Sequence, residues 1–310
     1  MPPAAPVLPR FVKCRVEAGL REFLEGSGVP QVDFAHPLGE PALAAPDSVS
    51  WRVFRNPVAL FVGGVAAVLL ELAEPRVRTG VWEHTSFRTD PLPRLRRTGM
   101  AAMVTVYAAR STAERMIAGV RARHGLVAGV TPAGEPYRAD DPELLAWVHA
   151  TASFGFLEAY RAYVRPVAAA DRDRFYAEGA PAAALYGASA TPRSEAEVFA
   201  LFEAMRPRLE RSEIVFEFLD ILRRTPILPA PLRSLQGLLI RAAVELVPAK
   251  VRSILGLGRA WRLSAPERRV VEILGRIADA VEIEAAPWTQ ARRRLDLTPA
   301  ENAKGPREGA

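Results

Sequence analysis

Two clusters of side chains in the middle of the chain have types and spacings that suit ligand chemistry. Arg94, Arg97 and Thr98 form the first cluster, and Arg121 and His124 form the second. Residues three or four positions apart share one side of a helix, so Arg94 would lie beside Thr98 and Arg121 beside His124. Guanidinium groups bind carboxylates and imidazole nitrogens bind metal ions, so both clusters are candidates for a binding site.

The second cluster falls on a helix that we expect over residues 112–128. Ser111 followed by Glu114 is a capping-box pattern, which indicates a helix start. One face of this helix is mostly apolar, with residues spaced three and four positions apart: Ile117, Val120, His124 and Val127. The imidazole is therefore expected among apolar side chains, with the Arg121 guanidinium on the same side.

An imidazole in apolar surroundings with guanidinium groups nearby suits a haem. Haem is a flat apolar ring whose iron binds a neutral imidazole nitrogen and whose two carboxylates bind arginines. The alternative is structural, because a histidine on an apolar face is most often a hydrogen-bonded core residue. The spacing alone leaves both interpretations of His124 open.

His149 is the rival ligand to His124. The residues at 141–143 predict a helix start, because Asp caps a helix, Pro suits its first position and Glu favours its positive end. This helix would continue to about Val164 and place His149 on a face with Leu145, Ser153 and Phe156. The imidazole is either a ligand or a structural group bonded to a neighbouring helix.

Motifs over residues 54 to about 190 resemble the catalytic domain shared by latex-clearing protein (rubber oxygenase) and the MpaB oxygenases. They are GG-x-x-A-x-L-L-E-L-A-E-P at Gly63–Pro75, G-V-x-x-H-T-x-F-x-x-D-P at Gly80–Pro91 followed by R-L-R-R-T, V-R-x-x-H at Val120–His124, and Y-x-A-x-D-P-E-L-L-x-W-V-H-A-T at Tyr137–Thr151. They occur in the family's order and together span nearly half of the chain.

The resemblance implies a globin-like helical core that binds haem b through one histidine and uses oxygen. The ligand histidine of the family lies in the V-R-x-x-H segment, which implies His124 as axial ligand and Arg121 beside the cofactor. The family's arginine and threonine near the other haem face imply Arg94 and Thr98 as catalytic residues, and Arg94 is also expected to bind the cofactor. Arg97 stands where rubber oxygenases can carry a lysine, and it is the third expected catalytic residue. By the same resemblance, His149 is favoured as a structural residue.

The chain departs from the family pattern at three points. Ala128 stands where many relatives carry an arginine, and Glu74-Pro75 stands where relatives commonly carry His-Pro. No clear counterpart of the carboxylate assigned as base in rubber cleavage is visible. The resemblance therefore supports haem binding better than it supports polymer cleavage.

The composition is that of an ordinary globular protein, with 49% hydrophobic and 25% charged residues among 310. The net charge of +6 comes almost entirely from arginine, whose excess together with Ala and Pro is typical of a GC-rich genome. No nucleic-acid-binding motif accompanies it, so we expect no nucleic-acid partner.

Compartment signals are few. The one cysteine, Cys14, excludes an internal disulfide and a thiolate metal cluster. The first residues lack the charged start and apolar core of a signal peptide, so we expect a cytoplasmic protein. Residues 232–262 combine apolar side chains with arginines and a lysine, which would suit peripheral contact with an anionic membrane surface. The alternative for this stretch is a core helix with a solvated basic face.

The predicted fold is all-α, with a single helical domain over residues 51–298. Residues 1–50 are expected to form an irregular wrap that includes a short helix over Phe11–Leu24, and residues 299–310 a disordered tail. Helices are expected over 57–73, 91–108, 112–128, 142–164, 171–178, 194–209, 212–224, 232–247, 251–257 and 265–282. Thr131–Gly134 is expected to be a turn.

These observations favour a haem-b-dependent oxygenase that acts with dioxygen on an apolar substrate of unsaturated or isoprenoid type. The first alternative is a non-catalytic protein of the same fold that binds haem or lipid. The second is a haem-free helical interaction protein in which His124 is only a core residue. The redox partner has no sequence signature.

Overall fold

The computed structural model describes residue 26 and residues 28–297. The elements are α2 (Val49–Phe54), α3 (Pro57–Glu71), α4 (Pro75–His84), α5 (Pro91–Tyr107), α6 (Arg110–His124), β1 (Ala128–Val130), β2 (Pro136–Arg138), α7 (Pro142–Tyr163), α8 (Ala169–Tyr186), α9 (Glu195–Met205), α10 (Glu213–Arg224), α11 (Arg233–Leu246), α12 (Ala249–Ile254), α13 (Ala265–Ala280) and α14 (Pro287–Arg294), with short 3-10 turns at 206–208, 230–232 and 259–261. The predicted helix over Phe11–Leu24 and the predicted disordered tail lie outside the described residues.

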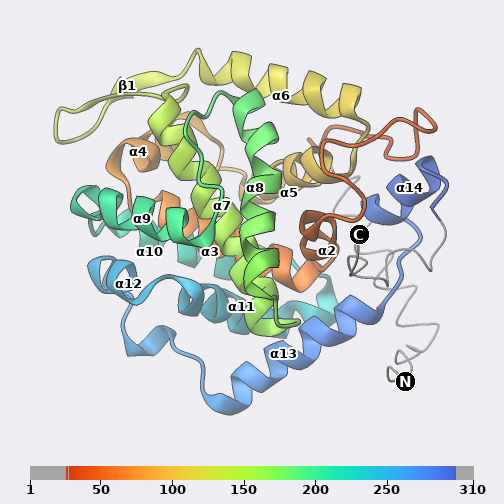
Figure 1. The fold of residues 1–310 in the computed structure, drawn as a ribbon. Coiled ribbons are helices and arrows are strands. Elements are labelled where there is room, and N and C mark those ends of the chain that lie inside the picture. The colour runs from red at the N-terminus through yellow and green to blue at the C-terminus, as the bar shows by residue number, and fades with distance from the viewer. Residues whose placement is uncertain (1–25, 27, 298–310) are drawn as a thin grey trace.

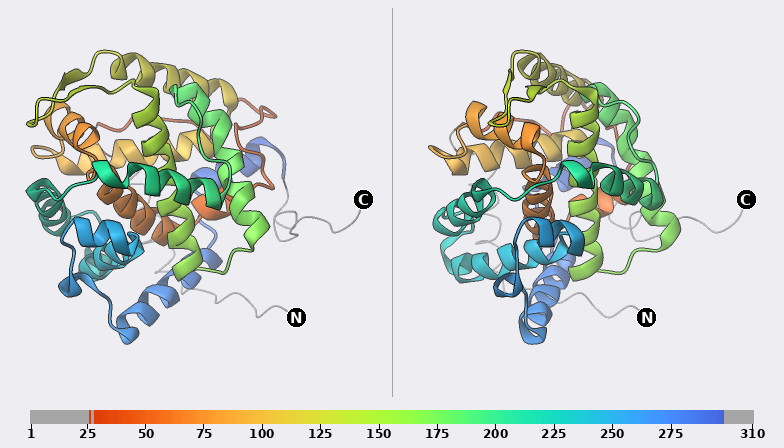
Figure 2. Two further views of the ribbon diagram at one scale, coloured as in Figure 1. Left: turned by 60° about the vertical axis from the view of Figure 1, so that its left-hand side comes forward. Right: turned by 90° about the vertical axis from the view of Figure 1, so that its left-hand side faces the viewer.

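Over the described residues the fold is all-α, as the sequence predicts, apart from one two-stranded antiparallel hairpin of β1 and β2. In all views α6 and this hairpin lie at one end of the molecule, and α13 lies at the other (Figures 1 and 2). The long α7 joins the two ends and packs along α3. Helices α5 and α8 both contact α6 and hold it against the body of the protein.

The crossing of α3 and α7 forms the centre of the core. Both helices bury most of their apolar side chains, including Val62, Leu69 and Leu157. Their backbones touch at Gly63 and Gly155, where a Cβ added to Gly63 would lie 2.7 Å from the carbonyl oxygen of Gly155. Because glycine has no side chain, Gly63 of the Gly-Gly pair allows the backbone of α7 to approach α3 closely.

Most predicted helix starts agree with the structure. Asp141 caps α7 by accepting bonds from the N–H groups of Glu143 and Leu144, and Ser212 caps α10. Ser264 and Glu267 form the reciprocal capping box that their spacing predicts.

The predicted start and end of α6 are wrong. The helix begins at Arg110, and the side chain of Ser111 donates to Glu40 instead of capping it. It ends at His124 because residues 128–130 pair with the second strand of the hairpin. Val127 therefore lies outside the helix that carries His124.

The predicted limits of the helix over 171–178 are also wrong. Helix α8 begins at Ala169, and Asp171 instead forms an ion pair with Arg52 at 2.7 Å. The helix continues through Pro181 to Tyr186, eight residues beyond its predicted end. Helices α2, α4 and α14 were not predicted.

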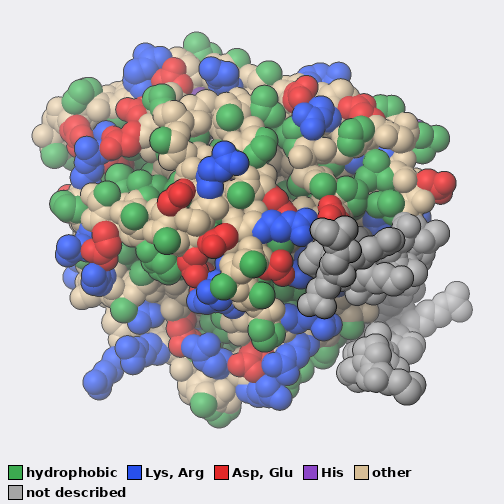
Figure 3. All heavy atoms as spheres, viewed as in Figure 1, with side chains coloured by type: hydrophobic (Ala, Val, Ile, Leu, Met, Phe, Trp, Pro, Cys, Tyr) green, Lys and Arg blue, Asp and Glu red, His purple; other side chains and the backbone are tan. Residues whose placement is uncertain are grey.

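Three basic side chains of residues 232–262 have partners within the protein. Arg241 pairs with Glu267, Lys250 pairs with Glu203 at 2.8 Å, and Arg252 donates to a backbone carbonyl. Basic and acidic side chains are also interspersed over the face in Figure 3. Within the described part of the chain, no single helix is long and apolar enough to cross a membrane. Helices α3 and α4, which meet at a bend of 112°, have the length and composition of a membrane span only when they are taken together.

Arg294 ties the N-terminal segment to α5 and α14. Its side chain is 1% exposed and donates to the carbonyl oxygens of Phe34, Glu40 and Tyr107 at 2.7–2.9 Å. Replacing Arg294 with methionine leaves three carbonyls without this donor, so we expect the free energy of unfolding to fall by at least about 3 kcal/mol in urea titrations.

The adjacent Arg293 provides the control. It pairs with Glu284 on the surface, where both side chains are more than half exposed. Arg293→Met should change the free energy of unfolding by less than about 1 kcal/mol. Equal losses in the two variants would show that the buried carbonyl contacts of Arg294 do not stabilise the fold.

Candidate functional site

Glu71, Arg94 and His124 come from three helices and face one region of the interior. Glu71 is the last residue of α3, Arg94 lies in the first turn of α5, and His124 ends α6. Burial is the largest influence on the pKa of both Glu71 and His124, and the Arg94 charge acts on both pKa values in the downward direction. The predicted clusters around residues 94 and 124 are thus brought together.

Burial of Glu71 dominates its titration. Loss of hydration raises the pKa of this carboxyl from 4.5 to about 7, and the nearby Arg94 only partly opposes this shift. The group is therefore shared between its neutral and charged forms near neutral pH. Sequence reasoning missed it, although Glu71 is the first charged residue after the uncharged run from Asn56 to Leu70.

The His124 imidazole is half-buried and neutral at pH 7. Burial lowers its pKa most, and the charges of Arg123 and Arg94 lower it further, while Asp140 acts in the opposite direction. Its Nδ1 atom is buried and has no hydrogen-bond partner. A neutral imidazole with an unsatisfied nitrogen is the form that binds a metal ion.

Arg94 and Thr98 share one face of α5, as their spacing predicts. Arg94 donates through Nη1 to the Thr98 hydroxyl, and that hydroxyl donates to the Arg94 carbonyl at 3.0 Å. Arg97 lies close enough to lower the pKa of Arg94, but its guanidinium donates to Ser86 at 3.1 Å. Arg97 therefore points toward the loop before α5.

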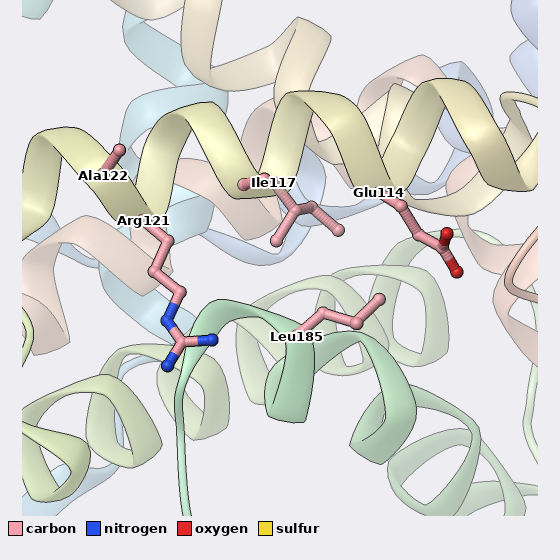
Figure 4. Close-up of a pocket in the computed structure, with 6 residues that line it drawn as sticks. Glu114, Ile117, Arg121, Ala122 and Leu185 are labelled. Carbon is pink, nitrogen blue, oxygen red and sulfur yellow. The ribbon is translucent and has the colours of Figure 1, made fainter.

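Arg121 lies apart from this set. Its guanidinium packs over Gly187 at the end of α8, where Nε would lie 3.6 Å from an added Cβ. It points into a cavity between α6 and α8 (Figure 4). The charges that act on the pKa of His124 come from Arg123, Arg94 and Asp140 rather than from Arg121. The predicted role of Arg121 at a cofactor stays a prediction.

His149 lies between α7 and α8. A Cβ added to Gly179 would lie 3.0 Å from its Cε1 atom, and its Nε2 lies 3.5 Å from the Ser153 hydroxyl. Burial lowers the pKa of its imidazole to about 4. This packing fits the structural interpretation of His149 better than a ligand role.

The residues around His124 fit a haem better than they fit a bare metal ion. Among residues 28–297, no group of three or more His, Cys, Asp and Glu could hold a metal ion. The Nε2 atom of His84 lies 3.0 Å from the Tyr137 hydroxyl and links α4 to the hairpin. A macrocycle needs only one protein ligand, and His124 offers an unpartnered nitrogen with the cationic Arg94 nearby for a carboxylate.

The protein is thus all-α, and a histidine, an arginine and a carboxyl from three separate helices lie within electrostatic reach of one another. Residues 51–281 match the family described as ER-bound oxygenase mpaB/B'/Rubber oxygenase, catalytic domain, and the chain belongs to this family. No curated protein and no solved structure is significantly similar to it. The match confirms the resemblance of the sequence motifs and makes the protein an oxygenase-family enzyme, for which dioxygen and a substrate are the partners.

Glu71 gives the protein a stability that depends on pH. Its folded pKa of about 7 lies above the unfolded value of 4.5, so its stabilising contribution is complete below pH 4.5 and is lost as the pH rises through 7. We expect the free energy of unfolding to fall by about 1 kcal/mol between pH 6 and pH 9, and Glu71→Gln to abolish this fall. Urea titrations at the two pH values measure it.

Glu217 provides the comparison, because it is an exposed carboxylate that pairs with Arg88 at 3.3 Å. The Glu217→Gln variant should retain the fall in stability seen in the parent protein. A parent protein whose stability is the same at pH 6 and pH 9 would contradict the raised pKa of Glu71.

Proposed function

We propose that the protein is a haem-b-dependent oxygenase that acts with dioxygen on an apolar substrate of unsaturated or isoprenoid type. The observation that carries the proposal is the neutral imidazole of His124, whose buried Nδ1 lacks a partner and which lies within the electrostatic reach of Arg94. Membership of an oxygenase catalytic-domain family supports it.

His124 would be the single protein ligand of the haem. When bound, the haem supplies a redox-active iron for the activation of dioxygen. Because burial and two arginines keep the imidazole neutral, His124 does not have to lose a proton before it binds iron at pH 7. Of the predicted cofactor-binding arginines, Arg94 is the one whose charge reaches His124.

Arg94 and Thr98 would bind and orient polar groups on the α5 side of the site. The bond from Arg94 to the Thr98 hydroxyl limits the rotamers of the guanidinium, so its charge has a fixed direction. Arg97 would act less directly, because its bond to Ser86 holds its guanidinium away while its charge lowers the pKa of Arg94.

Glu71 would hold or release a proton beside Arg94. A carboxyl group with a pKa of about 7 is divided between acid and base at neutral pH, which is the condition for efficient proton transfer. This residue would supply the carboxylate for which the sequence motifs offered no clear counterpart. Buried apolar side chains on the same helices, such as Leu70 of α3 and Met100 of α5, would exclude water and favour an apolar substrate.

Absorption spectroscopy tests the proposal. The purified full-length chain, mixed with one equivalent of haem, should show a Soret band that shifts when dithionite and carbon monoxide are added. Oxygen uptake with an unsaturated isoprenoid substrate should then follow. Absence of the Soret band would overturn the haem assignment, and haem binding without oxygen uptake would favour the non-catalytic binding protein.

A further inference from the structure

A cavity of about 390 Å³ lies between α6 and α8, on the side of α6 that carries Arg121. Its lining comprises Glu114, Ile117, Ala118, Arg121, Ala122 and Leu185. The volume falls in the range of small-molecule sites, which begins at about 300 Å³. Figure 4 shows Arg121 at one end and Glu114 at the other, with Ile117 and Leu185 between them.

The two charged ends of this cavity differ. The Glu114 carboxylate has a cation beside it, since Arg110 lies 3.7 Å away on the same helix. Arg121 has no hydrogen-bond or ion-pair partner among the residues that the structure describes. Its guanidinium is exposed, so its donors are available to an anion from solvent.

The end of α8 holds the Arg121 side chain in place. Gly187 closes α8 in the left-handed conformation with φ of 100°, and the Arg121 Nε packs against it. The last carbonyls of a helix carry partial negative charge, which attracts a guanidinium without forming a full ion pair. The Arg121 guanidinium is therefore held in position before any ligand binds, and it still lacks a counter-ion.

The middle of the cavity is apolar. Ile117 is 1% exposed and forms a fixed part of the wall, and Leu185 faces it from α8. Ala118 and Ala122 are small, so they leave the space open. From Glu114 to Arg121 the cavity runs along α6 for seven residue steps, a length of about 10 Å.

We propose that this cavity binds an apolar chain that carries one carboxylate, of the fatty-acid class. The carboxylate forms a charge-assisted pair with Arg121, and the chain lies along Ile117 and Leu185 toward Ala118. Because Arg110 already pairs with Glu114, only the Arg121 end offers a cation without a counter-ion, so a monocarboxylate is preferred over a dicarboxylate. This site is additional to the haem site of the proposed function and does not depend on it.

Calorimetric titration of the full-length chain with dodecanoate, below the concentration at which it forms micelles, tests the proposal. The parent protein should bind dodecanoate, and Arg121→Met should weaken binding at least tenfold. Dodecan-1-ol, which has the same chain without the charge, should bind the parent at least tenfold more weakly than the acid. Arg115→Met, which removes another guanidinium from α6, should bind dodecanoate as the parent does.

Ala118→Phe tests whether binding needs the space of the cavity as well as the charge of Arg121. Ala118 is exposed, so the larger side chain fills the cavity without disturbing the core, and dodecanoate binding should be lost. No dodecanoate binding by the parent, or equal binding by the parent, Arg121→Met and Ala118→Phe, would overturn the proposal.

Haem titrations of the same variants test whether Arg121 binds a haem propionate instead of a fatty-acid carboxylate. Arg121→Met is the informative variant. If it loses haem while its affinity for dodecanoate is unchanged, Arg121 serves a haem propionate and the fatty-acid assignment is wrong. Because the dodecanoate titration is made without haem, a failure of the proposed oxygenase function would leave this result unaffected.

Discussion

Replacing Gly63 with alanine is expected to lower the free energy of unfolding by more than about 3 kcal/mol. The added methyl group would lie 2.7 Å from both the Gly155 carbonyl oxygen and the Cα atom of Phe156. These are backbone atoms of α7, so no rotation of a side chain can relieve the clash, and α3 and α7 must move apart. Separation of these helices would loosen buried contacts along the whole crossing.

Gly64 is a matched control one residue further along α3. A Cβ at Gly64 would lie 3.8 Å from the nearest atom, Cε1 of Phe156, which is an ordinary van der Waals distance. Gly64→Ala should leave stability unchanged or raise it by up to about 1 kcal/mol, because alanine favours the helix more than glycine does. Urea titrations followed by circular dichroism compare the variants, and similar stabilities would contradict the backbone contact at Gly63.

The two glycines also show how far the sequence defines the fold. A Gly-Gly pair in an apolar helix permits close approach of a backbone or of a flat ligand, and the sequence could not decide between them. The structure assigns Gly63 to the backbone of α7 and leaves Gly64 in ordinary contact. The choice depends on the position of Gly155, 92 residues away in the chain, which no local pattern encodes.

Errors in the helix limits have the same origin. Ser111 has the residue type and spacing of a helix cap, but Glu40 from the preceding segment accepts its N–H and hydroxyl. Helix α4 escaped prediction because its cap is Glu74, whose carboxylate accepts the N–H of Val77. Glutamate is not among the usual cap residues, so the local sequence gave no start signal there.

The candidate site was partly predictable. Spacing alone was enough to place Arg94 beside Thr98, because i and i+4 neighbours on a helix meet wherever the helix lies. The resemblance to the oxygenase family singled out His124. Glu71 could not be found in this way, since its raised pKa depends on burial and on Arg94 from another helix. Tertiary contacts decide which charged residue becomes chemically useful.

Replacing His124 with alanine is expected to abolish coordination of haem iron by the protein. The imidazole is neutral and its Nδ1 has no hydrogen-bond partner, so its removal breaks no hydrogen bond made by that atom. We therefore expect the free energy of unfolding to change by only about 1 kcal/mol or less, while the haem spectrum changes completely. Exogenous imidazole should restore a histidine-like spectrum, because it can fill the space left by the side chain.

His149→Gln is the matched control for this experiment. His149 is the rival ligand, and its imidazole packs against Gly179 with a pKa that burial lowers to about 4. The variant should retain the Soret band of the parent protein at pH 7. Loss of that band in His149→Gln and its retention in His124→Ala would show that His149 of α7, and not His124, is the iron ligand. Retention in both variants would mean that neither histidine binds the iron, because a haem bound through one imidazole cannot keep its spectrum when that imidazole is removed.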